Sequence, residues 1–487
     1  MAGLRSSTLH ALSDRIPVPA YDRAAVRTGI VHVGVGGFHR AHLAVYHDEL
    51  LARGDLDWGI CGVGVLPADV AMRDALRAQD GLYTLIVKHP DGRCDARVIG
   101  SLVEYLLAPE DPEAVIEKMA APATHIVSLT ITEGGYSVDD VTGAFDPSAP
   151  DIAADLAGDG PPRTAFGLIV EALARRRERG VAPFTVLSCD NLEGNGDIAR
   201  TALASFAWLR EPALGEWVER EVPFPNSVVD RITPATTDAD RALLRDRFGV
   251  EDLWPVVCEP FCQWVIEDPP RPRPSYEAVG ATVLADVRPH ELMKLRMLNA
   301  GHQAIAYFGM LCGHEFVDEA VGDPLIGGFL EGYLRDEAAP SLEGVSAREA
   351  ADYQRTLLTR FANPGVRDRL ARLAVDASDR IPKFLLPVVR ERLATGGDVR
   401  RCAAVVASWA RYADGFDEQG EPVEVIDRRR GRLRTLARRQ PRDLDAFLGE
   451  EAGLGDLASD ERFAAPYRAA LASLYARGAR ATLAELA

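Results

Sequence analysis

The chain has 487 residues, of which 47% are hydrophobic, and it carries a formal net charge of −18 at pH 7. This length has room for roughly two or three domains with large buried cores. The acidic balance repels phosphate backbones and anionic lipid, and no basic run stands out against it. We therefore expect neither nucleic acid nor a membrane surface as a partner.

No window reaches the length of a transmembrane helix, and the first residues contain no apolar signal core, so we expect a cytoplasmic protein. The seven cysteines are scattered, which argues against a disulfide framework. The closest pair, Cys258 and Cys262, is too widely spaced for a CxxC motif and has no second Cys or His cluster to complete a zinc site. We expect reduced thiols and no bound metal.

The first half of the chain alternates strand and helix signals. "GIVHVGVG" (29–36) predicts a buried strand, and "HRAHLAVYHDELLARG" (39–54) predicts a helix that ends at Gly54. "WGICGVGV" (58–65) and "ADVAMRDALRAQD" (68–80) repeat this order. Such alternation is typical of parallel βαβ units.

The next segment, residues 82–100, has the pattern of a hairpin with Asp91 and Gly92 at its turn. The alternation then resumes with a strand at 124–132, a helix at 165–180 and a strand at 184–190.

Proline-rich "DPPRPRPS" (268–275) predicts a loop near a domain boundary. Beyond a last strand signal at 281–287 the pattern is helical, most clearly at 291–311, 347–362 and 402–413. We therefore expect an α/β fold: a Rossmann-type dinucleotide-binding domain over residues 1–284, followed by a mostly α-helical domain over residues 285–487. Function is expected in the cleft between them.

A glycine turn follows the first predicted strand, with Gly34, Gly36 and Gly37 in "VGVGGFHRAH". Glycines at a strand-to-helix turn let the main chain approach a pyrophosphate closely. His39 stands where the GxGxxG motif has its third glycine, so an ordinary tight turn remains an alternative.

An acidic residue after the second strand of such a unit accepts hydrogen bonds from the adenosine ribose and repels a 2′-phosphate. Asp69 is the candidate, although it lies further along than the usual spacing. Its position suits the N-cap of the next helix equally well.

Lysine is rare in this chain and occurs only at Lys88, Lys118, Lys294 and Lys383. Lys294 opens "KLRMLNAGHQ" (294–303), where an ideal α-helix spreads Lys294, Asn299 and His302 over about 140° and about 12 Å of the axis. They can line one side of a cleft. Taken singly, they can also be a snorkelling lysine, a helix-end hydrogen-bonder and a core histidine.

Six sequence blocks taken together resemble the polyol-specific long-chain dehydrogenases, the mannitol dehydrogenase family. In chain order they are "GVGGFHRAH", "SLTITEGGY", "SCDNLEGNG", "FPNSVVDRITP", "VCEPFCQWVIED" and "KLRMLNAGHQ". The resemblance thins only in about the last fifty residues. It implies a Rossmann-type domain and a helical domain, NAD or NADP bound between them, and no metal.

The resemblance also implies roles for particular residues. Lys294 corresponds to the general base, and Asn191 and Asn299 correspond to the residues that hold the reacting oxygen. The residues expected to contact substrate hydroxyls are His302, Asp230, Arg372 and Arg380. Glu133 and Glu291 match carboxylates that pass the proton of the lysine to water. The cofactor-binding set is Gly34, Gly36, Gly37, Phe38, Arg40 and Asp69.

These residue types suit the oxidation of a secondary alcohol. That reaction needs a base for the hydroxyl proton, donors for the developing oxyanion and a nicotinamide for the hydride. Lysine can act as a base, whereas arginine keeps its proton. Two departures bear on selectivity: Arg380 replaces a lysine of the family, and Ala68 replaces a second acidic residue beside Asp69.

The expected reaction is the NAD-dependent interconversion of D-mannitol and D-fructose. D-arabinitol 4-dehydrogenase, another polyol dehydrogenase and fructuronate reductase are alternatives within the family, and a non-catalytic dinucleotide sensor is a remote one. The sequence leaves the oligomeric state open and is compatible with a monomer.

Overall fold

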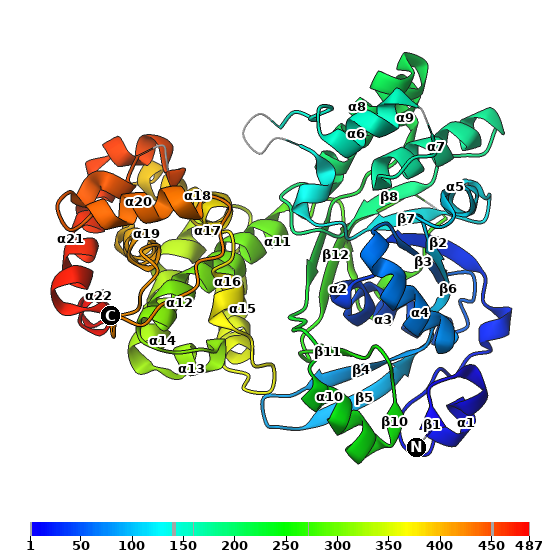
Figure 1. Ribbon diagram of the computed structural model, residues 1–487, viewed down its shortest axis with the longest axis horizontal. Coiled ribbons are helices and arrows are strands. Elements are labelled where there is room, and N and C mark those ends of the chain that lie inside the picture. The colour runs from blue at the N-terminus through cyan, green and yellow to red at the C-terminus, as the bar shows by residue number, and fades with distance from the viewer. Residues whose placement is uncertain (1, 139–142, 159, 271, 450–451, 487) are drawn as a thin grey trace. The chain divides into compact units, whose positions relative to one another are not determined.

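The computed structural model describes residues 2–138, 143–158, 160–270, 272–449 and 452–486 (Figure 1). The described chain divides into two compact units, Met1–Lys88 with Arg93–Val287, and His89–Gly92 with Arg288–Ala487. The functional division after residue 284 stays a prediction. No helix in the described part of the chain is both long and apolar enough to cross a membrane.

The first unit is built on a parallel sheet, as the alternating pattern predicted. Within the described residues it has five strands, in the order β6 (Leu102–Leu107), β3 (Gly59–Gly64), β2 (Thr28–Val33), β7 (Ile126–Leu129) and β8 (Thr185–Ser188).

Helices cover both faces of this sheet (Figure 1). On one face Val31, Val33 and Val127 pack against α5 (Pro112–Ala120), α7 (Ala165–Glu178), α8 (Asn195–Arg210) and α9 (Pro212–Glu221). On the other, Ile30 and Ile60 pack against α3 (Leu43–Ala52) and α4 (Val70–Ala78). Successive side chains of a strand point to opposite faces, so both faces of these apolar strands are buried.

The predicted hairpin is confirmed by β4 (Tyr83–Lys88) and β5 (Cys94–Ile99), which pair antiparallel. It lies in a separate sheet in which β4 also pairs with β11 (Val256–Cys258). A further sheet joins β9 (Ser227–Asp230), β12 (Gln263–Glu267) and β13 (Thr282–Leu284). The sequence did not predict β9, β11 or β12, nor the edge strand β6 of the parallel sheet.

The remaining elements of the first unit are short. They include the parallel pair β1 (Ala2–Gly3) and β10 (Val250–Glu251), and the helices α1 (Leu9–Leu12), α6 (Pro150–Ala157) and α10 (Asp238–Leu243).

The helix predicted over 39–54 is in fact two helices. The backbone of His42, with φ −123° and ψ −87°, separates α2 (Gly37–Ala41) from α3. The His42 ring stacks on Phe38, and its Nε2 lies 2.7 Å from Gln263 O. These tertiary contacts hold His42 outside the helical conformation, and periodicity alone did not predict the break.

The second unit is helical, as predicted, and strand pairing in its described residues is limited to isolated bridges. Its helices are α11 (Arg288–Met293), α12 (Ala300–Leu311), α13 (Val317–Gly322), α14 (Pro324–Tyr333), α15 (Ala347–Phe361), α16 (Leu370–Leu373), α17 (Ala377–Arg380), α18 (Leu386–Ala394), α19 (Arg400–Tyr412), α20 (Arg430–Arg439), α21 (Glu461–Arg477) and α22 (Ala479–Leu486).

The helix predicted over 291–311 contains a π-helical turn, Lys294–Asn299, between α11 and α12. Ala300 N donates to Leu295 O, five residues earlier. A π turn is wider than an α turn, so residues five apart lie nearer the same side of the axis. The expected 140° spread, derived for an ideal α-helix, therefore does not hold for Lys294 and Asn299.

The glycine turn begins where β2 ends. Gly34 has φ +95°, and a Cβ placed on it would lie 2.1 Å from Thr130 O. Thr130 N donates to Val33 O at 3.0 Å, so the two segments are fixed against each other. Gly36 has φ −97°, and a Cβ there would meet nothing within 4 Å.

We expect Gly34→Ala to lower the free energy of unfolding by about 3 kcal/mol, because alanine is strained at positive φ and its methyl group overlaps a main-chain carbonyl. Gly36→Ala is the matched control and should change it by less than about 0.5 kcal/mol. Urea unfolding followed by circular dichroism measures both. Equal stabilities would contradict the close contact at Gly34.

Candidate active site

Two buried histidines lie directly beneath the glycine turn. His39 takes the place of the third glycine of the motif, and its ring stacks on His32 with centroids 3.6 Å apart. His32 Nε2 lies 3.2 Å from Gly34 O and 3.0 Å from Thr130 Oγ1, and its Nδ1 lies 2.8 Å from Ser128 Oγ. A carbonyl only accepts, so Nε2 carries the proton and Nδ1 accepts from Ser128.

Burial keeps this histidine pair neutral. It lowers the pKa of His32 to about 3, against a smaller opposing effect of the hydrogen bond to Gly34. Burial and the neighbouring His32 hold the pKa of His39 well below its usual range. The pair therefore serves as an uncharged spacer between β2 and α2. The main chain at Gly36 is left open on its other side, which suits close approach by a ligand.

Phe38 and Arg40, both predicted to bind the cofactor, make internal contacts. Phe38 stacks on His42 with ring centroids 4.8 Å apart. Arg40 is 3% exposed, its Nη1 donates to Trp254 O, and its guanidinium carbon lies 5.3 Å from the Tyr83 ring centroid. Cofactor binding by these two residues stays a prediction.

Asp69 lies just beyond the end of β3, half-buried. Its Oδ2 accepts from Leu66 N at 2.9 Å, which leaves Oδ1 for a further partner. The side chain makes no hydrogen bond to the start of α4, so it is not an ordinary N-cap. A Cβ on Gly64 would lie 2.6 Å from Tyr105 Oη and 3.1 Å from Asp69 Oδ2, which places both polar groups at the end of β3.

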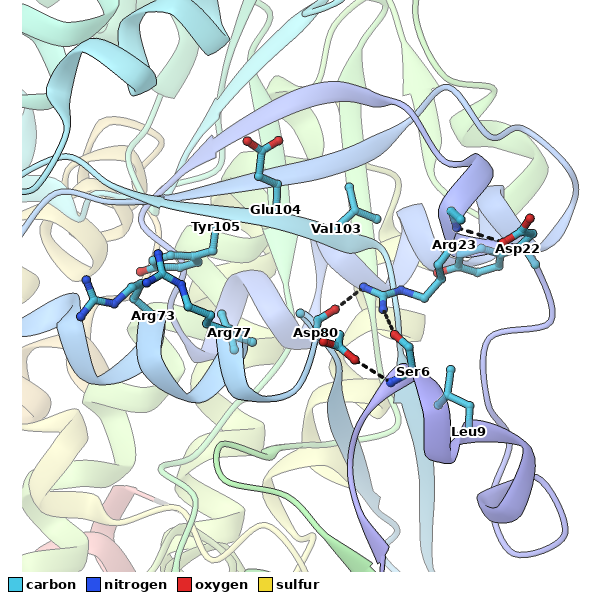
Figure 2. Close-up of a pocket in the computed structure, with 14 residues that line it drawn as sticks. Ser6, Leu9, Asp22, Arg23, Arg73, Arg77, Asp80, Val103, Glu104 and Tyr105 are labelled. Atoms are coloured by element: carbon cyan, nitrogen blue, oxygen red, sulfur yellow. Dashed lines mark hydrogen bonds between the residues drawn. The ribbon is translucent and has the colours of Figure 1, made fainter.

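A pocket of about 670 Å³ runs along α4 and the edge strand β6 in the first unit (Figure 2). Arg73, one turn after Asp69, lines it and is held by Asp74 and Glu110. Arg23 lines it too and donates to the carbonyls of Gly100, Asp80 and Leu102 and to Ser6 Oγ. These two cations are engaged within the protein, so neither is available for a 2′-phosphate beside Asp69.

Three predicted site residues of the first unit follow successive strands. Asn191 comes after β8 and is exposed, whereas Asp230 ends β9 and is 5% exposed. Glu133 opens the 3₁₀ helix after β7, and its side chain lies outside the described residues.

Two residues that the sequence did not single out hold these strand ends together. Asp190 accepts from Thr132 N at 2.9 Å and from Ile131 N at 3.1 Å, which ties the end of β8 to the end of β7. Asn195 donates to Asp190 O and Ser227 O and accepts from Ser227 N. These bonds tie the end of β8 to β9. Both lie in the block "SCDNLEGNG", so the signal was present.

The predicted residues of the second unit begin on one continuous helical stretch. Lys294, Glu291 and His302 are 6%, 7% and 9% exposed, and Asn299 is half-buried. The His302 ring stacks on Phe361 with centroids 4.6 Å apart. The π turn starts at Lys294 and ends at Asn299. Such turns are frequent at functional sites.

Arg372 and Arg380 lie at the same turn, which is hydrogen-bonded to Gln303 of α12. Arg372 donates to the buried Asp368 through Nε at 2.7 Å, and half of its side chain is exposed. Arg380 Nη1 donates to Leu373 O at 3.1 Å, and Gln303 Nε2 donates to the same carbonyl at 3.1 Å.

Gln303, the residue after His302, is thus a support that the sequence did not single out. It is 1% exposed, and its Oε1 accepts from the Tyr307 hydroxyl, so both ends of its amide are held. Gln303 therefore fixes the position of the main chain at Leu373, next to Arg372. The described residues contain no group of three or more His, Cys, Asp or Glu side chains arranged to hold a metal.

A parallel sheet with a glycine turn after its first strand, followed by a helical unit with a buried lysine, defines a Rossmann-type dehydrogenase. The Mannitol dehydrogenase Rossmann domain model matches residues 28–277, and the Mannitol dehydrogenase C-terminal domain model matches residues 286–475. The chain therefore belongs to the mannitol dehydrogenase family, and the predicted family and fold class are confirmed.

Relatives agree over nearly the whole chain. The mannitol 2-dehydrogenase of Phaeosphaeria nodorum is 45% identical over 99% of this chain and 85% of its own length, and that of Aspergillus terreus is 47% identical over 92% and 91%. The Pseudomonas fluorescens mannitol 2-dehydrogenase, solved as a ternary complex with NAD and D-mannitol, is 42% identical with a TM-score of 0.91 over 100% of this chain and 99% of that one. A substrate-free D-sorbitol dehydrogenase is 37% identical with a TM-score of 0.88, over 99% and 100%.

Proposed function

We propose that this chain catalyses the NAD-dependent interconversion of D-mannitol and D-fructose. The observation that carries the proposal is its full-length similarity, at 42% identity and a TM-score of 0.91, to an enzyme solved with NAD and D-mannitol. Relatives named mannitol 2-dehydrogenase match 92–99% of the chain.

The first unit has the features that NAD requires. Gly36 leaves the main chain open for the pyrophosphate, and Asp69 Oδ1 can accept from a ribose hydroxyl. Arg73, one turn after Asp69, is held by carboxylates, which makes it less available to a 2′-phosphate. NAD, when bound, supplies the acceptor for the hydride.

In the proposed reaction Lys294 takes the proton of the reacting hydroxyl on its Nζ. The amide groups of Asn299 and Asn191 donate to the oxygen as it gains negative charge. When the hydride leaves the carbon that bears this oxygen, the oxygen becomes the carbonyl oxygen of the ketose. Amides can stabilise the oxyanion without a Lewis acid, and we propose a reaction that needs no metal.

The other predicted residues are assigned to substrate and proton handling. Asp230, His302, Arg372 and Arg380 hold the remaining hydroxyls in the proposal, and Gln303 keeps Arg372 at its position. Arg380 Nη1 donates to the carbonyls of Arg372 and Leu373, which fixes its guanidinium group beside Arg372. Glu291 and Glu133 pass the proton of Lys294 to water.

We propose a cytoplasmic location for this reaction. All seven cysteines are free, which fits a reducing compartment.

A substrate series tests the proposal. With NAD, D-mannitol should be oxidised fastest, D-arabinitol should be a good second substrate and D-sorbitol should be poorer. A higher kcat/KM for D-sorbitol than for D-mannitol would instead favour the activity named for the D-sorbitol dehydrogenase relative. The assay follows the absorbance of the reduced cofactor. A higher kcat/KM for mannonate than for mannitol would move the chain to the uronate reductases, and NAD binding without turnover of any polyol would favour a sensor.

A second prediction concerns Lys294. Lys294→Ala should lower kcat for mannitol oxidation by at least about 10²-fold, the typical loss when a general base is removed. Lys294→Arg should not restore it, because the charge returns without a removable proton. Lys118→Arg is the control, since Lys118 pairs with Glu104 on the first unit and has no role in the proposed reaction.

Titration of NAD into the Lys294 variants should show unchanged affinity, since the proposed nucleotide contacts lie in the first unit. A small primary amine should partly restore activity to Lys294→Ala. If Lys294→Arg keeps near-normal oxidation at neutral pH, the base is another group, with Glu133 and Glu291 next in line.

A third prediction concerns the cofactor. Asp69→Ala should reduce the ratio of kcat/KM for NAD to that for NADP by about tenfold, about 1.4 kcal/mol, because the carboxylate no longer binds the ribose or repels a 2′-phosphate. Parallel assays with both cofactors measure the ratio. Equal use of NAD and NADP by the unmutated enzyme would refute the role of Asp69.

A further inference from the structure

The expectation that no basic run stands out does not hold for residues 428–439, where seven of twelve residues are arginine and none is acidic. Most of this run forms α20, which buries Leu433, Leu436 and Ala437 against the second unit. In a chain with a net charge of −18, such a concentration of cations must be balanced by nearby carboxylates or by an anion from solution.

Some of these arginines are balanced by the protein. The ion pairs are Arg428 with Asp379, Arg438 with Asp414, and Arg439 with Asp443. Arg430 and Arg434 differ: among the described residues, no carboxylate forms an ion pair with either. Asp427, the nearest acidic residue in sequence, instead accepts from Arg429 N and from the amide and hydroxyl of Ser378.

The two unbalanced arginines line the same cavity, of about 410 Å³, in the second unit. This volume lies in the range of about 300–1,000 Å³ found for small-molecule sites. The Arg434 guanidinium carbon lies 5.9 Å from the Phe416 ring centroid, and its buried Nε makes no hydrogen bond with a described residue. The opposite wall belongs to residues 413–425, with apolar Phe416, Pro422 and Val423 and one acidic side chain, Glu424.

That wall is held in place before any ligand binds. Val423 N donates to Gly415 O at 3.0 Å, and Phe416 and Pro422 form an isolated bridge. The Tyr412 hydroxyl donates to Glu424 O at 3.1 Å, which pins the loop to the end of α19. A preformed wall reduces the entropy that a ligand would lose in ordering it.

We propose that this cavity binds a small sugar or polyol phosphate, with Arg430 and Arg434 on the phosphate. Residues four apart on a helix lie about 5–6 Å apart at Cβ, so two guanidinium groups reach one phosphate. Guanidinium matches phosphate oxygens with paired hydrogen bonds. The apolar wall takes the carbon chain, and Glu424 accepts from a hydroxyl. The site is independent of the proposed reaction.

The test uses fructose 6-phosphate as the probe, titrated calorimetrically into the full chain. NAD is kept at saturation so that the dinucleotide site cannot bind the probe. Arg430→Gln combined with Arg434→Gln should weaken binding at least tenfold, because the charge-assisted hydrogen bonds of two guanidinium groups to the phosphate are lost. The matched control, Arg428→Gln combined with Arg439→Gln, removes the same charge from the same run of residues, leaves the ion pair of Arg438 with Asp414 in the cavity wall intact, and should change the affinity less than twofold.

Unmodified fructose serves as the second probe: any binding of it belongs to the proposed active site, so its affinity should be the same in the unmutated chain and in the cavity variant. The proposal is overturned if fructose 6-phosphate does not bind the unmutated chain, or if the control variant loses as much affinity as the cavity variant. It is also overturned if a heparin fragment binds α20 where fructose 6-phosphate does not, since that face would then recognise an extended polyanion. Turnover of mannitol is not a readout, so failure here leaves the proposed reaction untouched.

Discussion

The contact between Gly34 and the main chain of Thr130 is the constraint on which the first unit depends. Two strand ends meet so closely that no side chain fits between them. The Thr130 hydroxyl donates to Gly34 O at 2.6 Å, and His32 Nε2 lies within hydrogen-bonding distance of Gly34 O and Thr130 Oγ1. Side-chain hydrogen bonds therefore reinforce the main-chain contact at the turn. Main-chain packing therefore fixes the turn, and this explains why His39 can replace the third glycine by stacking on His32.

Much of the fold followed from local periodicity. The alternation of buried strands of four to six residues with helices predicted the parallel sheet, and Asp91-Gly92 predicted the turn of the hairpin. Periodicity failed where tertiary contacts decide the backbone, as at His42. It also missed β9 and β12, because these short strands are stabilised by pairing with each other across more than thirty residues of sequence.

The candidate site residues could be selected from the sequence, and their roles stay predictions. Lys294 stood out because lysine is rare in this chain, and the roles of Asn299 and His302 followed from the family resemblance of the block that contains them. Asp190, Asn195 and Gln303 act through hydrogen bonds to main-chain groups that are distant in sequence, and no spacing rule identifies such partners. The arginines of α20 were missed because their charge was averaged over an acidic chain.

The π turn at Lys294–Asn299 also sets the rotational register between two helices. A wider turn holds one more residue within nearly the same rotation about the axis, whereas each residue added to an α-helix would rotate the chain by about 100°. The π turn therefore absorbs the extra residue, and all of α11, Glu291 included, keeps its orientation relative to α12. An extra residue elsewhere in these helices, with no such turn to absorb it, would rotate the residues before it about a quarter of the way round, so the place of the extra residue is as strictly determined as the composition of the segment.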